Sequence, residues 1–151
     1  MGRKYVDVKV PAAAAPHVIY RLLRDGATWP TWSPLGSFEL ESPGAAEPEG
    51  LGAIRIFRTG RYTSRERIVE LVPDRRLSYE LVSGLPLRGY RADVDLETHG
   101  ASTTIHWHSS FVPKVPGTGW IYQRTLSRFI QRCAAGLAER ATASTTKVTE
   151  R

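Results

Sequence analysis

The sequence contains one cysteine, Cys133, among 151 residues. An intramolecular disulfide is therefore excluded, and packing of apolar side chains has to hold the fold together. Long apolar runs are also missing, because no segment approaches the ~20 residues of a transmembrane helix. The alanine run at 12–15 is too short for the core of a signal peptide. These absences predict a cytoplasmic protein without stable membrane insertion.

Blocks of like charge are missing as well. The net charge is +6, but basic residues are spread from Arg3 to Arg151, with acidic residues among them in segments such as "RERIVE" and "DVDLE". Runs of like charge are typical of tails that bind nucleic acid. We therefore predict a solvated, arginine-rich surface and no nucleic-acid partner. A basic module that binds nucleic acid or a protein is the alternative.

Motifs of common enzyme classes do not occur. There is no nucleophile elbow, no glycine-rich phosphate loop and no Cys/His cluster. His106 and His108 occupy alternate strand positions, so both face one side, as in half of a metal site. The large apolar residues Ile105 and Trp107 alternate with them and are expected on the inner side. The other two histidines, His17 and His99, are not spaced as further metal ligands. We therefore expect both imidazoles to point outward, and we predict no metal and no cofactor.

The chain predicts one α+β domain spanning residues 1–151, with an ordered core at about 4–141 and a frayed Thr/Ser-rich tail at 142–151. The hydrophobic period is two in 4–10 and becomes helical in 12–25. From 35 to 111 it indicates about six antiparallel strands, and from 120 onward a long helix. Pro30 and Pro34 restrict 27–35 to a short turn of helix or a tight loop.

Three segments resemble one family: "HVIYRLLRDGATWPTWSP", "RERIVELVPDRRLSYEL" and "YRADVDLETHGASTTIHW". Their order is similar to that of the SRPBCC superfamily, which has the START-like or helix-grip fold and includes the birch-pollen-allergen relatives. Within it, the chain most resembles bacterial polyketide cyclase/dehydrase and lipid-transport proteins, over about residues 4–140. The resemblance implies a curved antiparallel sheet of about seven strands around a long C-terminal helix, with two short helices between the first and second strands.

The same resemblance implies a hydrophobic cavity between sheet and helix. Such a cavity would bind a lipid, polyketide, steroid or other aromatic molecule in a monomer or homodimer. Some family members catalyse ring closure or dehydration, and many only bind. Trp29 and Pro30 match a Trp-Pro pair that family cyclases often carry after the first helix. Because members without a known reaction carry it too, a polyketide cyclase or aromatase is an alternative function.

Inward-facing positions supply the expected ligand contacts. They are Trp29, Trp32, Ile56, Arg58, Tyr79, Leu81, Tyr90, Val94, Trp107, Ser109, Tyr122, Leu126, Phe129, Ile130 and Cys133. Trp29 and Trp32 either form the cavity wall or fill the core, and we expect them to point in different directions. Tyr79 and Tyr90 either orient the ligand or bond to the backbone within the core.

Three polar residues are candidates for proton transfer: Arg58, Tyr79 and Ser109. Arg58 shares strand parity with Ile54 and Ile56, which places it inward, whereas Arg91 lies on the polar face. The alternative for the arginines is cross-strand pairing on the outer face. That alternative covers Arg55, Arg58, Arg65 and Arg67, paired with Glu66, Glu70 or Glu80.

Overall fold

One antiparallel sheet and one long helix make up most of the molecule. The structure is a computed structural model that describes residues 2–149. The sheet has seven strands in the order β1-β7-β6-β5-β4-β3-β2. The strands are β1 (Lys4–Ala12), β2 (Ser37–Ser42), β3 (Ile54–Thr59), β4 (Tyr62–Val72), β5 (Arg76–Ser83), β6 (Leu87–His99) and β7 (Ser102–Pro113). The predicted helix-grip architecture is confirmed.

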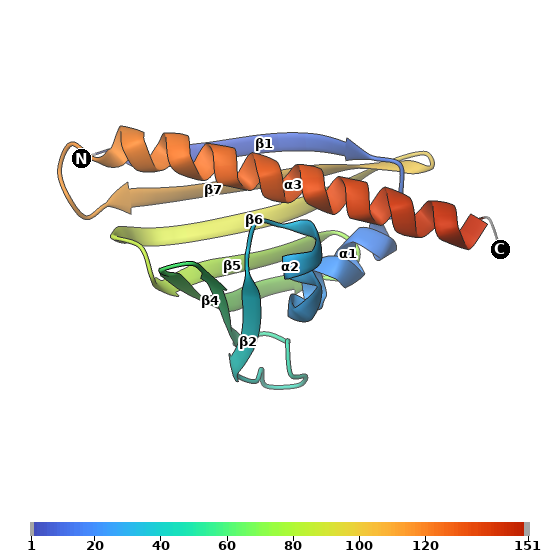
Figure 1. The fold of residues 1–151 in the computed structure, drawn as a ribbon, viewed down its shortest axis with the longest axis horizontal. Helices are drawn as coiled ribbons and strands as arrows, with labels where there is room; N and C mark the ends of the chain where they lie inside the picture. Colours follow the sequence, from blue (N-terminus) through green and yellow to red (C-terminus); the bar gives the residue numbers. More distant parts are fainter. Residues whose placement is uncertain (1, 150–151) are drawn as a thin grey trace.

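The helices cover one face of the sheet. The short elements α1 (Pro16–Arg24), η1 (Gly26–Thr28) and α2 (Trp29–Trp32) connect β1 to β2, and α3 (Gly119–Thr149) ends the chain. Figure 1 shows α3 lying lengthwise over β1 and β7, with α1 and α2 below it. We call the face of the sheet toward α3 the inner face and the opposite one the outer face.

Strand β7 shows why the chain forms this sheet. Its residues are alternately half-buried and buried along its whole length. Ile105, Trp107 and Phe111 are fully buried on the inner face, whereas His106 and His108 lie on the outer face. Successive side chains of a strand point to opposite faces of the sheet. The alternation therefore shows that one face of β7 packs against apolar side chains and that the other face is turned outward. The predicted outward orientation of the two histidines is confirmed.

Helix α3 continues further than the sequence predicted. Its buried side includes Leu126, Ile130, Cys133 and Leu137, as the apolar period indicates. It then runs to Thr149, eight residues past the position near 141 where the sequence placed the end of the ordered core. The Thr142 hydroxyl donates to the Ala138 carbonyl at 2.8 Å and accepts from the Ala13 amide at 3.2 Å, which joins this part of α3 to the segment that follows β1. No described helix, α3 included, combines the length and apolarity needed to cross a membrane.

Gly136 allows α3 to approach α2 closely. A Cβ at this position would lie 1.7 Å from the Trp32 carbonyl oxygen, which is backbone and cannot rotate away. Gly136→Ala is therefore expected to push α3 away from α2 and to lower the free energy of unfolding by about 1–3 kcal/mol, despite alanine's better helix propensity. Urea denaturation measures the loss. Ala135→Gly, at an exposed neighbouring position, should cost no more than the propensity difference of about 1 kcal/mol, and an equal or larger loss there would contradict the packing explanation.

Candidate functional site

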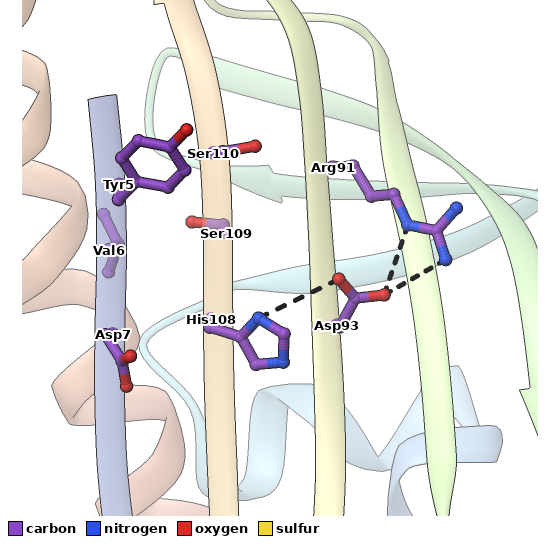
Figure 2. A pocket seen from close by; sticks show the side chains of 8 residues that line it. All are labelled: Tyr5, Val6, Asp7, Arg91, Asp93, His108, Ser109 and Ser110. Atoms are coloured by element: carbon purple, nitrogen blue, oxygen red, sulfur yellow. Dashed lines mark hydrogen bonds and ion pairs between the residues drawn. The ribbon is translucent and has the colours of Figure 1, made fainter. Parts of the chain in front are cut away.

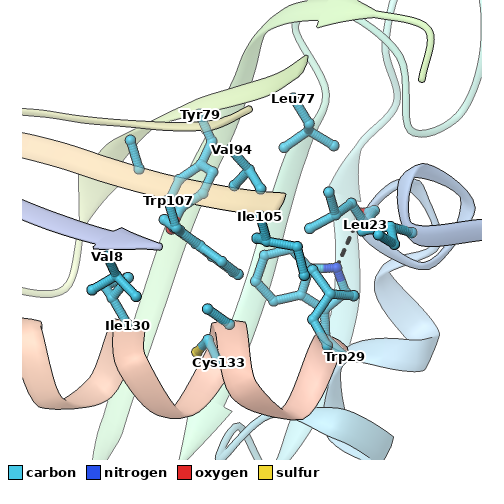
Figure 3. Close-up of a cluster of buried hydrophobic side chains, with 14 of the residues drawn as sticks. Val8, Leu23, Trp29, Leu77, Tyr79, Val94, Ile105, Trp107, Ile130 and Cys133 are labelled. Carbon is cyan, nitrogen blue, oxygen red and sulfur yellow. Dashed lines mark hydrogen bonds between the residues drawn. The ribbon is translucent and has the colours of Figure 1, made fainter. Parts of the chain in front are cut away.

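Trp29 is the centre of an aromatic cluster on the inner face. Its side chain is 2% exposed, and its ring centroid lies 4.7 Å from Trp32, 4.9 Å from Phe57 and 5.7 Å from Trp107. The indole Nε1 donates to the Leu23 carbonyl at 3.0 Å, as Figure 3 shows. A tryptophan with its ring surrounded and its N–H satisfied is packed as core.

Trp32 belongs to the same cluster. It is 6% exposed, its Nε1 donates to Thr28 Oγ1 at 3.1 Å, and its ring lies 6.4 Å from Trp107. Residues three apart on a helical turn share a side, and α2 is a single such turn. The expectation that Trp29 and Trp32 point in different directions is therefore wrong.

Next to this cluster lies a group of buried hydroxyls. Tyr79 accepts a hydrogen bond from Trp107 Nε1 at 3.3 Å, and the rings of Tyr79 and Tyr90 are 6.4 Å apart. Burial, with the neighbouring Tyr90 and Glu66, raises the pKa of Tyr79 well above its ordinary value. Burial, followed by Glu66, likewise raises the pKa of Tyr90, while the Ser109 and Tyr79 hydroxyls oppose that rise. Both phenols are therefore protonated at neutral pH and can donate to an oxygen of a ligand.

Ser109 contributes a third hydroxyl from β7. Its side chain is 5% exposed, and its Oγ makes no hydrogen bond of good geometry within residues 2–149. Buried hydroxyls are normally paired. The Ser109 hydroxyl lies near that of Tyr90 and opposes the rise in its pKa, but no hydrogen bond of good geometry joins them, so Ser109 keeps bonding capacity on the inner face.

Arg55 is buried inside the domain. Its side chain is 0% exposed, and its guanidinium lies 5.0 Å from the Trp29 ring and 5.4 Å from the Phe57 ring. Nη1 donates to the Leu23 carbonyl at 3.0 Å and to Glu49 Oε1 at 3.3 Å. Burial lowers the pKa of Arg55, while Glu66 and Glu49 oppose this. Nε and Nη2 have no hydrogen-bond partner in the described part of the chain.

Glu66 lies opposite Arg55 in the β3–β4 register, on the inner face. Its Oε1 accepts a hydrogen bond from Ser64 Oγ at 3.1 Å, whereas Oε2 is buried without a partner among the residues described. Burial raises the pKa of Glu66 to about 7, although Arg55 and the Ser64 hydroxyl oppose the rise. A carboxyl with this pKa can both donate and accept a proton near neutral pH.

Most residues expected to contact a ligand do meet on the inner face. The buried core includes Trp29, Trp32, Tyr79, Tyr90, Val94, Trp107, Leu126, Ile130 and Cys133, with Leu81, Tyr122 and Phe129 partly buried against it. Burial, followed by the charge of Glu66, raises the pKa of the Cys133 thiol, so this cysteine is a neutral core side chain. Leu81, Tyr122 and Phe129 each keep part of their apolar surface exposed.

Two expected residues lie on the other side of the sheet. Arg58 is 46% exposed and pairs with Glu39 at 3.0 Å, and Ile56 has the same strand parity as Arg58. The inward placement of Ile56 and Arg58 is therefore corrected. The reason is Phe57, which packs on Trp29 and fixes the opposite parity of β3 on the inner face. Arg55 shares the parity of Phe57 and takes the inward position expected for Arg58.

The expected outer-face ion pairs are present in part. Arg67 pairs with Glu80 at 3.3 Å, as expected. Arg65 pairs instead with Glu41 at 2.7 Å, and Glu70 pairs with Arg91, which was not among the expected arginines. The pairing of Arg55 with Glu66 on this face is not observed, because both side chains turn inward. Sequence reasoning therefore missed Arg55 and Glu66 as inner-face residues. The parity of Phe57 in "IRIFRT" was the available signal.

The two histidines of β7 join a charged network on the outer face. His106 Nε2 lies 2.8 Å from Asp7 Oδ1, and His108 Nε2 lies 2.7 Å from Asp95 Oδ2. Donor atoms of Asp95, His106 and His108 lie within 4.8 Å of one another, and these are ligand types that Zn²⁺ accepts. However, the Arg76 guanidinium donates to Asp95 Oδ1 at 2.6 Å, so the carboxylate already has a cationic partner.

Two hollows lie outside the inner face. The first, of about 200 Å³, is formed on the outer side by charged and hydroxyl side chains that include Asp7, Arg91, Asp93 and His108, and Figure 2 shows Asp93 between Arg91 and His108. The second, of about 880 Å³, is an open groove along α3. Of the residues predicted to contact a ligand, Ser109 borders the first hollow and Phe129 the second.

The model of the polyketide cyclase/dehydrase and lipid transport family matches residues 4–142, nearly the whole chain. The chain belongs to this family. No protein with a curated function matches the sequence significantly.

Solved structures share the fold at low sequence identity. A START superfamily protein from Mycobacterium smegmatis aligns with a TM-score of 0.78 at 14% identity, covering 91% of this chain and 97% of that one. Norcoclaurine synthase from Thalictrum flavum aligns with a TM-score of 0.73 at 13% identity, covering 91% of this chain and 86% of that one. The ginseng major latex-like protein 151 from Panax ginseng gives a TM-score of 0.71 at 12% identity, covering 92% and 97% of the two chains. These similarities establish the fold of this polyketide cyclase/dehydrase and lipid transport family member.

Proposed function

We propose that the inner face binds a hydrophobic small molecule that carries at least one oxygen. The bound molecule would lie against the partly buried side chains of Leu81, Tyr122 and Phe129, where burial of apolar surface contributes about 25 cal/mol per Å². Family membership and the shared fold support a ligand of this class.

The single observation that carries the proposal is the set of unpaired polar atoms beside this apolar surface. Ser109 Oγ and Glu66 Oε2 are buried without partners among the described residues. A buried polar atom without a hydrogen bond destabilises the folded protein, because it has lost its bonds to water and gained none in return. A ligand oxygen in contact with Ser109, and with the protonated phenols of Tyr79 and Tyr90, would satisfy that requirement and set the ligand's orientation.

Ser109→Ala is expected to weaken ligand binding about five- to tenfold, the equivalent of one hydrogen bond. It should leave the melting temperature nearly unchanged, because Oγ makes no good hydrogen bond without ligand. Native mass spectrometry of protein purified from its own host identifies the ligand, and titration with that compound measures the affinity. Ser110→Ala is the matched control, since Ser110 lies on the outer face and accepts from Arg3 at 3.2 Å. Equal affinity of both variants would contradict the role of Ser109, and an empty protein that binds no apolar compound would contradict the proposed function.

Glu66 favours a second candidate, a cyclase-type enzyme that moves a proton. The Glu66 carboxyl has a pKa of about 7 and a buried Oε2 without a partner in the described residues, and its charge helps to raise the pKa of both phenols. Ring closure of a poly-β-ketone requires proton removal from carbon and proton delivery to oxygen, which such groups can perform. Incubation with a reactive poly-β-ketone tests this candidate, and product ratios that match those without protein would exclude it.

A further inference from the structure

The exposed apolar side chains gather at one end of the sheet. Seven large apolar residues are exposed among those described. Six of them lie near the starts of β1, β4 and α3 or near the ends of β5 and β7. These six are Tyr5, Tyr62, Val82, Val115, Trp120 and Ile121, and the seventh, Leu51, lies beyond the opposite end. We call the former the α3-start end, on the left of Figure 1. Scattered single apolar residues are ordinary on a surface, but such a one-sided grouping indicates an interaction site.

Contacts between distant segments make this end one continuous surface. Gln123 in α3 donates to the Tyr5 carbonyl at 2.9 Å, which joins α3 to β1. The Lys114 amide donates to the Pro86 carbonyl at 3.0 Å, which joins the β7–α3 loop to the β5–β6 loop. A Cβ on Gly84 would lie 2.2 Å from the Thr63 carbonyl oxygen, so the start of β4 adjoins the β5–β6 loop.

The same end is basic without acidic neighbours in sequence. Its segments, 2–6, 59–64, 82–90 and 112–124, contain no aspartate or glutamate. They contain Arg3, Lys4, Arg61, Arg88, Lys114 and Arg124, and none of these six forms an ion pair in the part of the chain that the structure describes. The loops at the opposite end carry Glu47, Glu49 and Asp74. The +6 net charge is therefore not spread evenly over the molecule.

We propose that the α3-start end docks reversibly on an anionic lipid surface. Tryptophan and tyrosine favour the headgroup region of a bilayer, where their rings and polar tips are both satisfied. Lysine and arginine near an anionic bilayer contribute about fivefold in affinity each. Trp120 is 62% exposed and lies between Lys114 and Arg124 in the sequence. This segment therefore offers both an aromatic ring for the headgroup region and positive charge for the anionic lipid. This proposal does not depend on what the inner face binds.

Trp120 also supplies the measurement. The other three tryptophans are 0–6% exposed, so fluorescence changes on docking come mainly from Trp120. Vesicles of equal parts phosphatidylcholine and phosphatidylglycerol are expected to shift its emission to the blue and to float the protein, whereas phosphatidylcholine alone should do neither. Raising the salt from 0.1 to 1 M, which shortens the screening length from about 10 to 3 Å, should release the protein.

Variants with matched controls decide whether this end is responsible. Arg88→Glu and Lys114→Glu should each lower vesicle affinity at least about fivefold. Arg75→Glu changes the net charge equally at the opposite end, where Arg75 is exposed, and should have little effect. Trp120→Ala should lower vesicle flotation, and Leu51→Ala should not. Absent flotation with anionic vesicles, or equal losses for Arg75→Glu and Arg88→Glu, would overturn the proposal. A third result would also overturn it: the protein is a dimer, Trp120→Ala dissociates the dimer, and neither protein binds vesicles. The surface would then be an interface between copies of this chain.

Discussion

Trp29→Ala is expected to lower the free energy of unfolding by about 3–5 kcal/mol, the range for removing a large buried aromatic side chain. The indole is 2% exposed and contacts four aromatic rings, so its removal leaves a cavity among these rings. The change also exposes the Arg55 guanidinium on one side, since that group lies 5.0 Å from the Trp29 ring. Trp29 is thus expected to behave as a structural core residue.

Chemical denaturation followed by circular dichroism measures this loss. Trp29→Phe keeps a ring and should recover part of the stability, although it leaves the Leu23 carbonyl without its indole donor. Trp120→Ala is the matched control, because Trp120 is 62% exposed and its loss should change the free energy of unfolding by no more than about 0.5 kcal/mol. If Trp29→Ala instead kept the melting temperature and lost only ligand affinity, Trp29 would be a wall of the binding site.

The order of elements could be predicted because each carries its own period. Strand β7 alternates without interruption, and its inner residues Ile105 and Trp107 were identified correctly. The broad apolar side of α3 was equally clear from Leu126, Ile130 and Cys133. In these elements local pattern and tertiary packing agree, so the sequence alone was sufficient.

The polar part of the site could not be predicted in the same way. In β3 both parities carry apolar residues, Ile54 and Ile56 on one side and Phe57 on the other. Hydrophobicity alone favoured the isoleucines, but the contact of Phe57 with Trp29, far away in sequence, decides the orientation. Arg55 and Glu66 turn inward with Phe57, and a buried charge is the less common arrangement for both residue types. Departures from the local pattern of this kind are typical of functional sites.

Glu66 leads to the prediction with the second largest effect. Its ordinary pKa of 4.5 applies in the unfolded chain, whereas burial raises the pKa to about 7 in the folded protein. Between these two values the folded state holds a proton that the unfolded state has released. Stability therefore falls as pH rises through this interval and stays low above it. The difference corresponds to about 3 kcal/mol at full ionisation.

Glu66→Gln removes this titration and keeps the shape of the side chain. The variant is expected to match the wild type below about pH 4.5 and to exceed its stability by up to about 3 kcal/mol at pH 8, a rise of several degrees in Tm. Thermal unfolding of both proteins between pH 4 and 8 measures the difference in their stability. The titration of all other groups is common to the two proteins and cancels in this difference. Glu80→Gln is the control, since Glu80 is 45% exposed beside Arg67 and should give a nearly constant difference. A Glu66→Gln protein that is less stable than the wild type at pH 8 would mean that Arg55 requires an ionised Glu66, and the carboxyl would then be a structural counter-ion with no proton to exchange near neutral pH.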